Sequence, residues 1–299
     1  MRRPFRTQHY QFWLLMALPL LYLIIFHYIP LGGLVLAFKN YNARLGIFHS
    51  PNVGLTYFKQ FLATPSSQRI IRNTFTLGFY SLLVGFPFPI LLAVMLNEVR
   101  SKFYKKTVQM VTYAPYFIST VVMVGMLMQL FDLRNGIVNR LVVACGGNAI
   151  NYFGKPELFS HLYVWSGVWQ GAGYASIIYI AALSSVPPEL KEAAIVDGAS
   201  NFRRIWHVDL PCIASTIVMM LIFNIGAIMN IGFEKVYLMQ NPANTSVSEI
   251  ISTFVYRIGL KGGNYGFSTA VGLFNSLLSL VLFLIANQLS RRYSDTSIW

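Results

Sequence analysis

Residues 189–211 read ELKEAAIVDGASNFRRIWHVDLP, and this charged stretch separates two long apolar runs. An ordinary connection at that place would be short and irregular. Here the strong helix formers Ala193 and Ala194 precede Gly198, and a second stretch without helix breakers follows it. We therefore expect two short helices that are separated at Gly198, with this glycine in the left-handed conformation that commonly ends a helix.

Proline and hydroxyl residues mark the ends of these two helices. The prolines at 187–188 fit the start of the first helix, because proline is tolerated in a first turn, and Ser185 is its predicted cap. Ser200 is placed to cap a second helix over residues 201–207, and Pro211 is expected to close it. The stretch thus predicts a folded helical element and not a flexible loop.

The charges of this element favour contact with a protein. An amphipathic helix on the inner leaflet would favour basic residues on its polar face, because that leaflet is anionic. Four acids outnumber three bases here: Glu189, Glu192, Asp197 and Asp209 against Lys191, Arg203 and Arg204. The element is therefore expected to dock another protein.

Outside this element the chain is that of a membrane protein. Only 11% of its 299 residues are charged, whereas soluble domains carry about 25%. Charge-free runs of about 20 residues or more can each cross the hydrocarbon core as a helix. A soluble helical core would instead need a polar face on each helix. The sequence predicts an all-α polytopic fold with one domain and six spans: 12–38, 74–96, 108–131, 162–183, 213–232 and 269–289. The first run is too long for a signal-peptide core of about 7–15 residues, so we expect a retained helix, kinked at Pro19.

Basic residues in the short flanks set the predicted orientation. With six spans, the two termini, the 97–107 loop and the 184–212 segment share one side of the membrane. The longer 39–73 loop, with five bases and no acid, argues for the opposite orientation. We give more weight to the short segments, because the charge rule applies best to short loops. We expect both termini in the cytoplasm, on the evidence of Arg2, Arg3, Arg6, Arg100, Lys102, Lys105, Lys106, Arg291 and Arg292.

The outer loops are then expected to be positive. Loops 39–73, 132–161 and 233–268 hold 11 Lys or Arg and 4 Asp or Glu, a net charge of +7. A positive outer mouth attracts anions, such as an acidic substrate. Contact with lipid headgroups or with an acidic partner protein would explain the same charge, and both interpretations stay open.

The spacing within the 184–212 segment resembles a known motif. Glu192-Ala193-Ala194, then Gly198, then residues 208–211 (Val-Asp-Leu-Pro) resemble the EAA loop of ABC importer permeases. Valine replaces the usual isoleucine at 208, and Asp209 stands where a small or hydroxyl residue is commoner. Pro187 and residues 197–199 fit the carbohydrate-uptake branch. Residues 115–119, 253–257 and 270–274 also resemble permeases of importers for complex or acidic oligosaccharides, such as the alginate importer, over roughly residues 70–290.

This resemblance implies a type I permease fold in a bacterial inner membrane. It implies a second permease subunit, which we expect to be homologous and not identical, a cytoplasmic ABC ATPase dimer and an extracytoplasmic solute-binding protein. Glu192 would pair with a basic residue of the ATPase, and the small residues would allow close packing. The residues expected to couple the permease to the ATPase are Glu189, Glu192, Ala193, Ala194, Asp197, Gly198, Ala199, Arg203 and Arg204.

The sequence contains no credible catalytic set, so we expect a transport subunit and not an enzyme. It has no Gly-x-x-x-x-Gly-Lys-[Ser/Thr] phosphate loop, so ATP and magnesium are expected on the partner ATPase and no cofactor on this chain. The five histidines are scattered, and Cys145 and Cys212 belong to no metal-binding cluster. No nucleic-acid partner is expected. No intramembrane acid or base suits the proton relay that ion-driven carriers often use.

A sugar path needs polar groups and aromatic faces among the helices. Unpaired amides are costly in lipid, so such side chains are expected to face protein or water, and hydrogen bonding between packed helices would explain them equally well. The candidates are Gln129, Gln170, Tyr174, Asn224, Asn230 and Asn275. The glycines of the same helices, such as Gly171 and Gly173, are expected to allow close packing between helices.

The leading interpretation is the permease of a binding-protein-dependent oligosaccharide importer that works by alternating access, with an acidic saccharide favoured over a neutral one. A stand-alone six-helix channel or carrier is the alternative of another class, and it leaves residues 189–211 without a role. A membrane enzyme would need a catalytic set that the sequence lacks.

Overall fold

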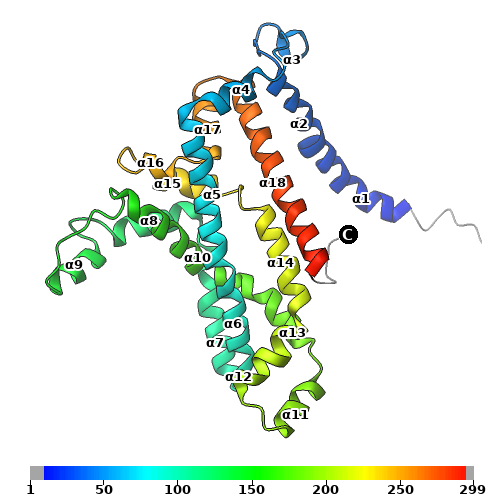
Figure 1. Ribbon diagram of the computed structural model, residues 1–299, viewed down its shortest axis with the longest axis vertical. Helices are drawn as coiled ribbons and strands as arrows, with labels where there is room; N and C mark the ends of the chain where they lie inside the picture. Colours follow the sequence, from blue (N-terminus) through cyan, green and yellow to red (C-terminus); the bar gives the residue numbers. More distant parts are fainter. Residues whose placement is uncertain (1–9, 294–299) are drawn as a thin grey trace, which may run out of the picture. The chain divides into compact units, whose positions relative to one another are not determined.

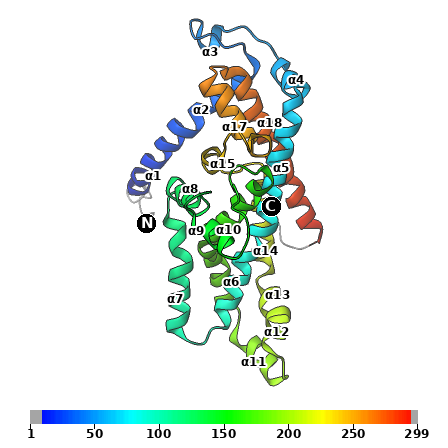
Figure 2. The same ribbon diagram turned by 90° about the vertical axis from the view of Figure 1, so that its left-hand side faces the viewer.

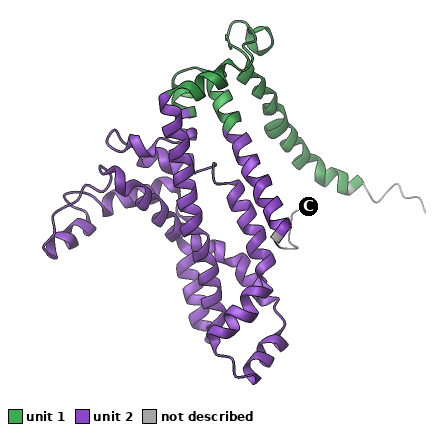
Figure 3. Cartoon of the chain, viewed as in Figure 1, with its two compact units in different colours: residues 1–64, 255–274 green, residues 65–254, 275–299 purple. Residues whose placement is uncertain are grey.

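The computed structural model describes residues 10–293; the predicted flank residues Arg2, Arg3 and Arg6 lie outside them. The described chain is built from helices, and its one β-bridge joins Lys39 and Asn52, so the predicted all-α class is confirmed (Figure 1). The chain divides into two compact units (Figure 3). Unit 1 comprises residues 1–64 and 255–274, and unit 2 comprises residues 65–254 and 275–299.

Unit 1 begins with the predicted first helix. Helical structure continues through Pro19 without ending there, and the departure from α-helical geometry follows in the π-helical η1. Phe38 and Phe58 pack with ring centroids 5.6 Å apart, which joins the end of this helix to the segment that follows. The elements are α1 (Tyr10–Leu23), η1 (Ile24–Tyr28), α2 (Ile29–Leu31), η2 (Gly32–Phe38), α3 (Gly46–His49), α4 (Thr56–Ala63), η5 (Tyr256–Lys261) and the start of α18 (Tyr265–Tyr293).

Unit 2 is organised around the 29-residue helix α10 (Pro156–Ser184), which contains the predicted span 162–183. This helix packs against α5, α6 and α7 (Figures 1 and 2). The other elements are α5 (Pro65–Gly85), α6 (Pro87–Glu98), α7 (Lys102–Tyr113), η3 (Ala114–Phe117), α8 (Thr120–Leu130), α9 (Ile137–Ala144), α11 (Pro188–Val196), α12 (Asn201–Arg204), η4 (Ile205–Asp209), α13 (Leu210–Cys212), α14 (Ala214–Gly226), α15 (Phe233–Met239), α16 (Thr245–Ser248), α17 (Ile251–Val255) and the rest of α18.

Glycine allows the closest helix contact in this unit. A Cβ atom built on Gly173 of α10 would lie 2.0 Å from the carbonyl oxygen of Thr112 in α7. No real side chain fits at that distance, so α10 and α7 can approach this closely only because residue 173 is glycine. The prediction of a packing role is thus confirmed for Gly173, whereas a Cβ on Gly171 would have no described atom within 4 Å.

By length and composition, three described helical stretches could cross a membrane: residues 12–38, 65–98 and 265–292. Two strongly bent helix pairs, 102–130 and 201–226, would bring the number to five. The polytopic fold class is therefore confirmed, while the number of six spans remains a prediction.

The predicted span 108–131 contains a sharp bend. Helical structure runs from Lys102 to Phe117, and α8 then leaves at an angle of 100°. The break lies after Pro115, and the Ser119 hydroxyl accepts a hydrogen bond from the Val122 amide to start α8. Residues 115–117 therefore belong to the end of the first helical stretch, in η3. The absence of charge across the break concealed it in the sequence.

The predicted span 213–232 is also shorter than expected. The α14 helix ends at Gly226, and residues 227–232 form no regular helix. Non-helical backbone in a membrane protein is tolerated where it is buried in protein or lines a cavity, because its polar groups need partners. The segment 227–232 therefore indicates a place where a path through the protein could lie.

Two segments of the predicted outer loops contain short helices. The loop 39–73 contains α3 and α4, and α5 already begins at Pro65. The apolar pattern over residues 245–258 does not form one continuous helix: α16 and α17 are separated at Glu249 and Ile250. In unit 2, Ile250 and Ile251 are buried and Asn73 donates hydrogen bonds to the carbonyls of Ser246 and Glu249. The pattern reflects burial in protein.

Candidate functional site

The predicted helical element at 189–211 is present at one end of unit 2, next to the end of α6 (Figures 1 and 2). Its first helix, α11, ends at Gly198, whose φ of +76° is the predicted left-handed conformation. The Ala199 amide donates to the Ala194 carbonyl at 2.9 Å, which closes the last turn. The Ser200 hydroxyl accepts from the Arg203 amide and caps α12, as predicted.

Two details of this element differ from the prediction. The Ser185 hydroxyl donates to the carbonyl of Ala182, so it belongs to the end of α10, and Pro187 takes the cap position of α11. Helical structure also continues past residue 207 to Cys212. It passes Pro211 because this proline lies in the first turn of α13, and the preceding π-helical η4 accommodates it.

Two ion pairs hold the element together and connect it to the transmembrane helices. The Lys191 Nζ lies 3.0 Å from the Asp209 Oδ1, which joins α11 to η4 across the Gly198 turn. Asp209 is only 1% exposed, so its departure from the usual motif has a structural reason: it is the partner of Lys191. The Arg204 guanidinium lies 2.7 Å from the Glu98 carboxylate at the end of α6. Arg204, expected among the coupling residues, thus faces the permease itself.

The element also carries exposed apolar side chains. Phe202 and Trp206 are exposed and stack on each other, with ring centroids 6.3 Å apart. Val196 is 87% exposed at the end of α11, and Leu190 and Ile195 are exposed along that helix. The predicted coupling residues Glu189, Glu192, Ala193, Asp197 and Gly198 are exposed as well, while Ala194 and Ala199 are half-buried. Large exposed apolar side chains on an ordered element indicate an interaction surface.

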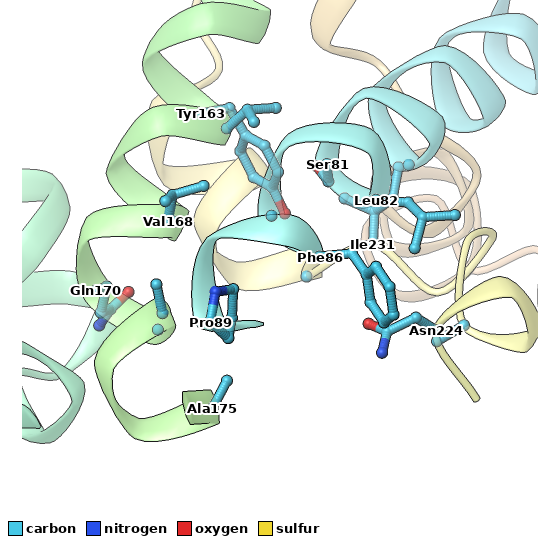
Figure 4. A pocket seen from close by; sticks show the side chains of 18 of the residues that line it. Ser81, Leu82, Phe86, Pro89, Tyr163, Val168, Gln170, Ala175, Asn224 and Ile231 are labelled. Carbon is cyan, nitrogen blue, oxygen red and sulfur yellow. The ribbon is translucent and has the colours of Figure 1, made fainter. Parts of the chain in front are cut away.

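A cavity of about 540 Å³ lies among α5, α6, α10 and the irregular segment 227–232 of unit 2. Figure 4 shows Tyr163 and Gln170 of α10 and Asn224 of α14 around this cavity. Four predicted path residues line it, and they come from two regions of the chain: Gln170, Tyr174, Asn224 and Asn230. The stretch 227–232 that breaks the predicted span therefore forms one wall of the cavity.

The other two predicted path residues do not line the cavity. Asn275 contacts the cavity wall instead: its amide donates hydrogen bonds to the Asn230 side-chain oxygen at 3.4 Å and to the Met229 carbonyl at 3.3 Å. Gln129 is exposed near the end of α8 and lies elsewhere. Gln170 lines the cavity and also joins packed elements, since its amide donates a hydrogen bond to the Ile118 carbonyl at 2.8 Å.

Sequence reasoning missed the charged residue of this cavity. Lys235 lines it from α15, although the sequence placed this residue in an outer loop after the fifth span. Tyr116 and Tyr163 also line it, and Tyr116 stacks on Tyr174 with ring centroids 3.9 Å apart. A lysine shortly after a long apolar run was the available signal. It identifies a site only once α14 is known to end at Gly226.

Tyr163 contacts the Lys235 side chain in two ways. Its ammonium donates to the Tyr163 carbonyl at 2.7 Å and lies 4.6 Å from the centroid of the Tyr163 ring. The side chain is 8% exposed, and this burial lowers the pKa of the Lys235 ammonium to about 7, since desolvation disfavours the charged form. Among the described residues, none of the three ion pairs includes Lys235.

The described residues contain no group of three or more His, Cys, Asp or Glu side chains that could hold a metal ion, and Cys145 and Cys212 are free thiols. The candidate sites are therefore a docking surface and a polar cavity. Both are suited to binding and movement.

The fold and these two sites define a membrane permease that works with other proteins. Residues 85–295 match the family of binding-protein-dependent transport system inner membrane components, and the chain belongs to that family.

Relatives extend this assignment over almost the whole chain. Protein LplB of Bacillus subtilis is 41% identical over 96% of this chain and 90% of that protein. The polygalacturonan/rhamnogalacturonan transport system permease protein YteP of the same organism is 42% identical over 95% of this chain and 89% of that protein. A chain of the bacterial alginate ABC transporter, solved in complex with alginate pentasaccharide-bound periplasmic protein, superimposes with a TM-score of 0.89 at 38% identity, over 97% of each chain.

These similarities confirm several predictions. The chain is an inner-membrane permease of a sugar or oligosaccharide ABC importer with the type I fold, and it is a transport component and not an enzyme. Such a permease works with a solute-binding protein and an ATPase, and in ABC importers ATP and magnesium belong to the ATPase. Family membership therefore excludes the stand-alone channel or carrier.

Proposed function

We propose that this permease carries acidic oligosaccharides of the alginate or pectin type into the cytoplasm. The observation that carries the proposal is the charge of the cavity: among the described residues that line it, Lys235 is the one charged side chain, and none is an acid. The net charge of +7 on the predicted outer loops supports the same conclusion, because it attracts anions toward the entrance. Relatives named for polygalacturonan/rhamnogalacturonan and alginate transport also support it.

The remaining lining of the cavity suits a saccharide. The amides of Asn224 and Asn230 are exposed to it and can exchange hydrogen bonds with sugar hydroxyls. The stacked pair of Tyr116 and Tyr174 offers a flat aromatic surface. Binding sites commonly combine such apolar walls with a few placed polar groups in volumes of roughly 300–1,000 Å³.

In the proposed mechanism, ATP hydrolysis outside the membrane moves the element at 188–212, which docks in a groove of the ATPase dimer. The Arg204–Glu98 ion pair transmits this movement to α6, and Pro89 of α6 lines the cavity. Alternate opening of the cavity then moves the saccharide inward. The complex contains a second, homologous but not identical permease, and both termini of this chain lie in the cytoplasm.

The decisive experiment measures ATP hydrolysis by the purified complex in lipid, with binding proteins loaded with a panel of saccharides. Stimulation by uronic-acid oligomers and not by malto-oligomers is the expected result. Stimulation by neutral oligomers alone would refute the acidic substrate and would assign the outer charge to docking of the binding protein. Absence of any co-purifying ATPase would contradict the docking role of residues 188–212.

Uptake of an acidic substrate is expected to depend on salt. Raising the ionic strength from about 0.05 to about 0.5 M shortens the Debye length severalfold, so steering by the positive outer loops weakens and uptake falls. The measurement is initial uptake into proteoliposomes, with binding-protein docking measured separately at each salt concentration. Uptake that stays constant while docking stays constant would favour a neutral oligosaccharide.

The ion pair between Glu98 and Arg204 can be tested by charge exchange. Glu98→Gln is expected to lower uptake per ATP hydrolysed about tenfold, because a partly buried guanidinium loses its partner and α12 loses its connection to α6. The double exchange Glu98→Arg with Arg204→Glu is the matched control and is expected to restore most of the loss. Equal coupling ratios in wild type and Glu98→Gln would rule out transmission through this pair.

A further inference from the structure

Lys235 is a buried lysine that forms an ion pair with no acid among the described residues. Its ammonium has three N–H donors, of which one is used by the Tyr163 carbonyl at 2.7 Å. The Tyr163 ring face lies 4.6 Å from it, which stabilises a cation electrostatically. Of the ion pairs among the described residues, Arg69–Glu249, Lys191–Asp209 and Arg204–Glu98, none reaches it.

The surrounding helix leaves space for this ammonium. A Cβ atom on Gly167 of α10 would lie 3.2 Å from the Lys235 Nζ, which is tighter than an ordinary contact. Gly167 therefore opens the wall of α10 at the point where the lysine reaches the main chain. Both residues line the cavity.

Packing alone does not account for a lysine here. Burying a charge costs free energy unless the charge is paired, and an apolar side chain of similar length would fill the same space without that cost. Ionisable residues inside membrane proteins generally mark the paths of substrates or ions. The two N–H donors that the Tyr163 carbonyl leaves unused point to an anionic ligand that enters the cavity.

We propose that Lys235 binds a carboxylate of the saccharide inside the cavity and is thereby a specificity-determining residue of the translocation path. This inference rests on the proposed acidic substrate and identifies the group that recognises it. The Tyr163 ring and carbonyl hold the ammonium at the cavity. An arriving carboxylate takes the remaining donors and forms a charge-assisted hydrogen bond. A single cation holds each uronate unit briefly, so binding does not prevent release.

The test compares two substrates in the complete transporter, reconstituted in liposomes with its binding protein. The substrates are a uronic-acid oligomer and the same oligomer with its carboxyl groups reduced to alcohols. Lys235→Met removes the charge and keeps the length of the side chain. Lys106→Met is the matched control, because it removes an exposed lysine that neither lines the cavity nor belongs to the outer loops. Each variant is compared with wild type on the same substrate, at saturating binding protein.

Lys235→Met is expected to lower uptake of the uronic-acid oligomer about tenfold or more, the loss typical of a hydrogen bond to a charged group. Uptake of the reduced oligomer is expected to stay within about twofold of wild type, because the interaction between lysine and carboxylate is absent from that pair. Lys106→Met is expected to change neither. Equal losses on both substrates, or no loss on either, would overturn the proposal.

Two further outcomes are distinguishable. If Lys235→Met lowers the yield of assembled complex, Lys235→Gln replaces that variant in the comparison, because glutamine retains a donor toward the Tyr163 carbonyl. Failure of both variants to assemble would show that the lysine is structural and would overturn the inference. A wild-type complex that transports only the reduced oligomer would refute the acidic substrate and the inference with it. A wild-type complex that transports uronates while both variants do so equally well refutes only the role of Lys235.

Discussion

Glu192→Lys is expected to abolish the stimulation of ATP hydrolysis by loaded binding protein while the permease stays in the membrane. Glu192 is exposed on α11, beside the apolar side chains that we propose to enter the groove of the ATPase. Reversing its charge would place a lysine against the basic residue that the family resemblance implies there. Losses of 2–5 kcal/mol are typical when a buried interfacial charge pair is broken, so stimulated hydrolysis should fall at least about tenfold.

The matched control for this experiment is Glu157→Lys. It makes the same charge change at an exposed position in the first turn of α10, far along the chain from the docking element. Co-purification of the ATPase with each variant gives an independent readout of docking. Unchanged stimulation and unchanged co-purification in Glu192→Lys would remove this residue from the interface.

Gly173→Leu is expected to prevent assembly of a stable permease. Even the Cβ atom of a larger residue would lie 2.0 Å from the Thr112 carbonyl oxygen, so α10 and α7 would have to separate. Overpacking of this kind typically costs about 1–3 kcal/mol, and more when the neighbour is rigid backbone. Gly173→Ala should therefore already lower the melting temperature of the purified complex by about 5 °C or more.

Gly171→Ala, two residues earlier on the same helix, is the control. A Cβ atom at that position has no described atom within 4 Å, so a methyl group there is expected to leave both yield and melting temperature unchanged. Thermal unfolding of the detergent-solubilised complex measures both variants. Equal melting temperatures for the two variants would contradict the close contact between α10 and α7.

The sequence alone predicted the features of this protein that depend on neighbouring residues. Gly198 takes up its left-handed conformation and Ser200 caps the following helix, because both depend on the few residues around them. The all-α class also follows from the sequence, since long charge-free runs can satisfy their backbone only as helices in a membrane. The resemblance of residues 192–211 to the EAA loop led to the family, which the comparison over residues 85–295 confirms.

Tertiary structure decided where the apolar runs bend and end. A charge-free run reports how hydrophobic a segment is, but it carries no signal for the 100° break before α8 or for the end of α14 at Gly226. Near those positions α10 packs against α7, η3 and α14, which lie far from their contacts in the sequence. Lys235 therefore looked like an outer-loop residue, although the early end of α14 places it at the cavity. Arg204 looked like a docking residue for the same reason, because its partner Glu98 lies 106 positions away in the chain.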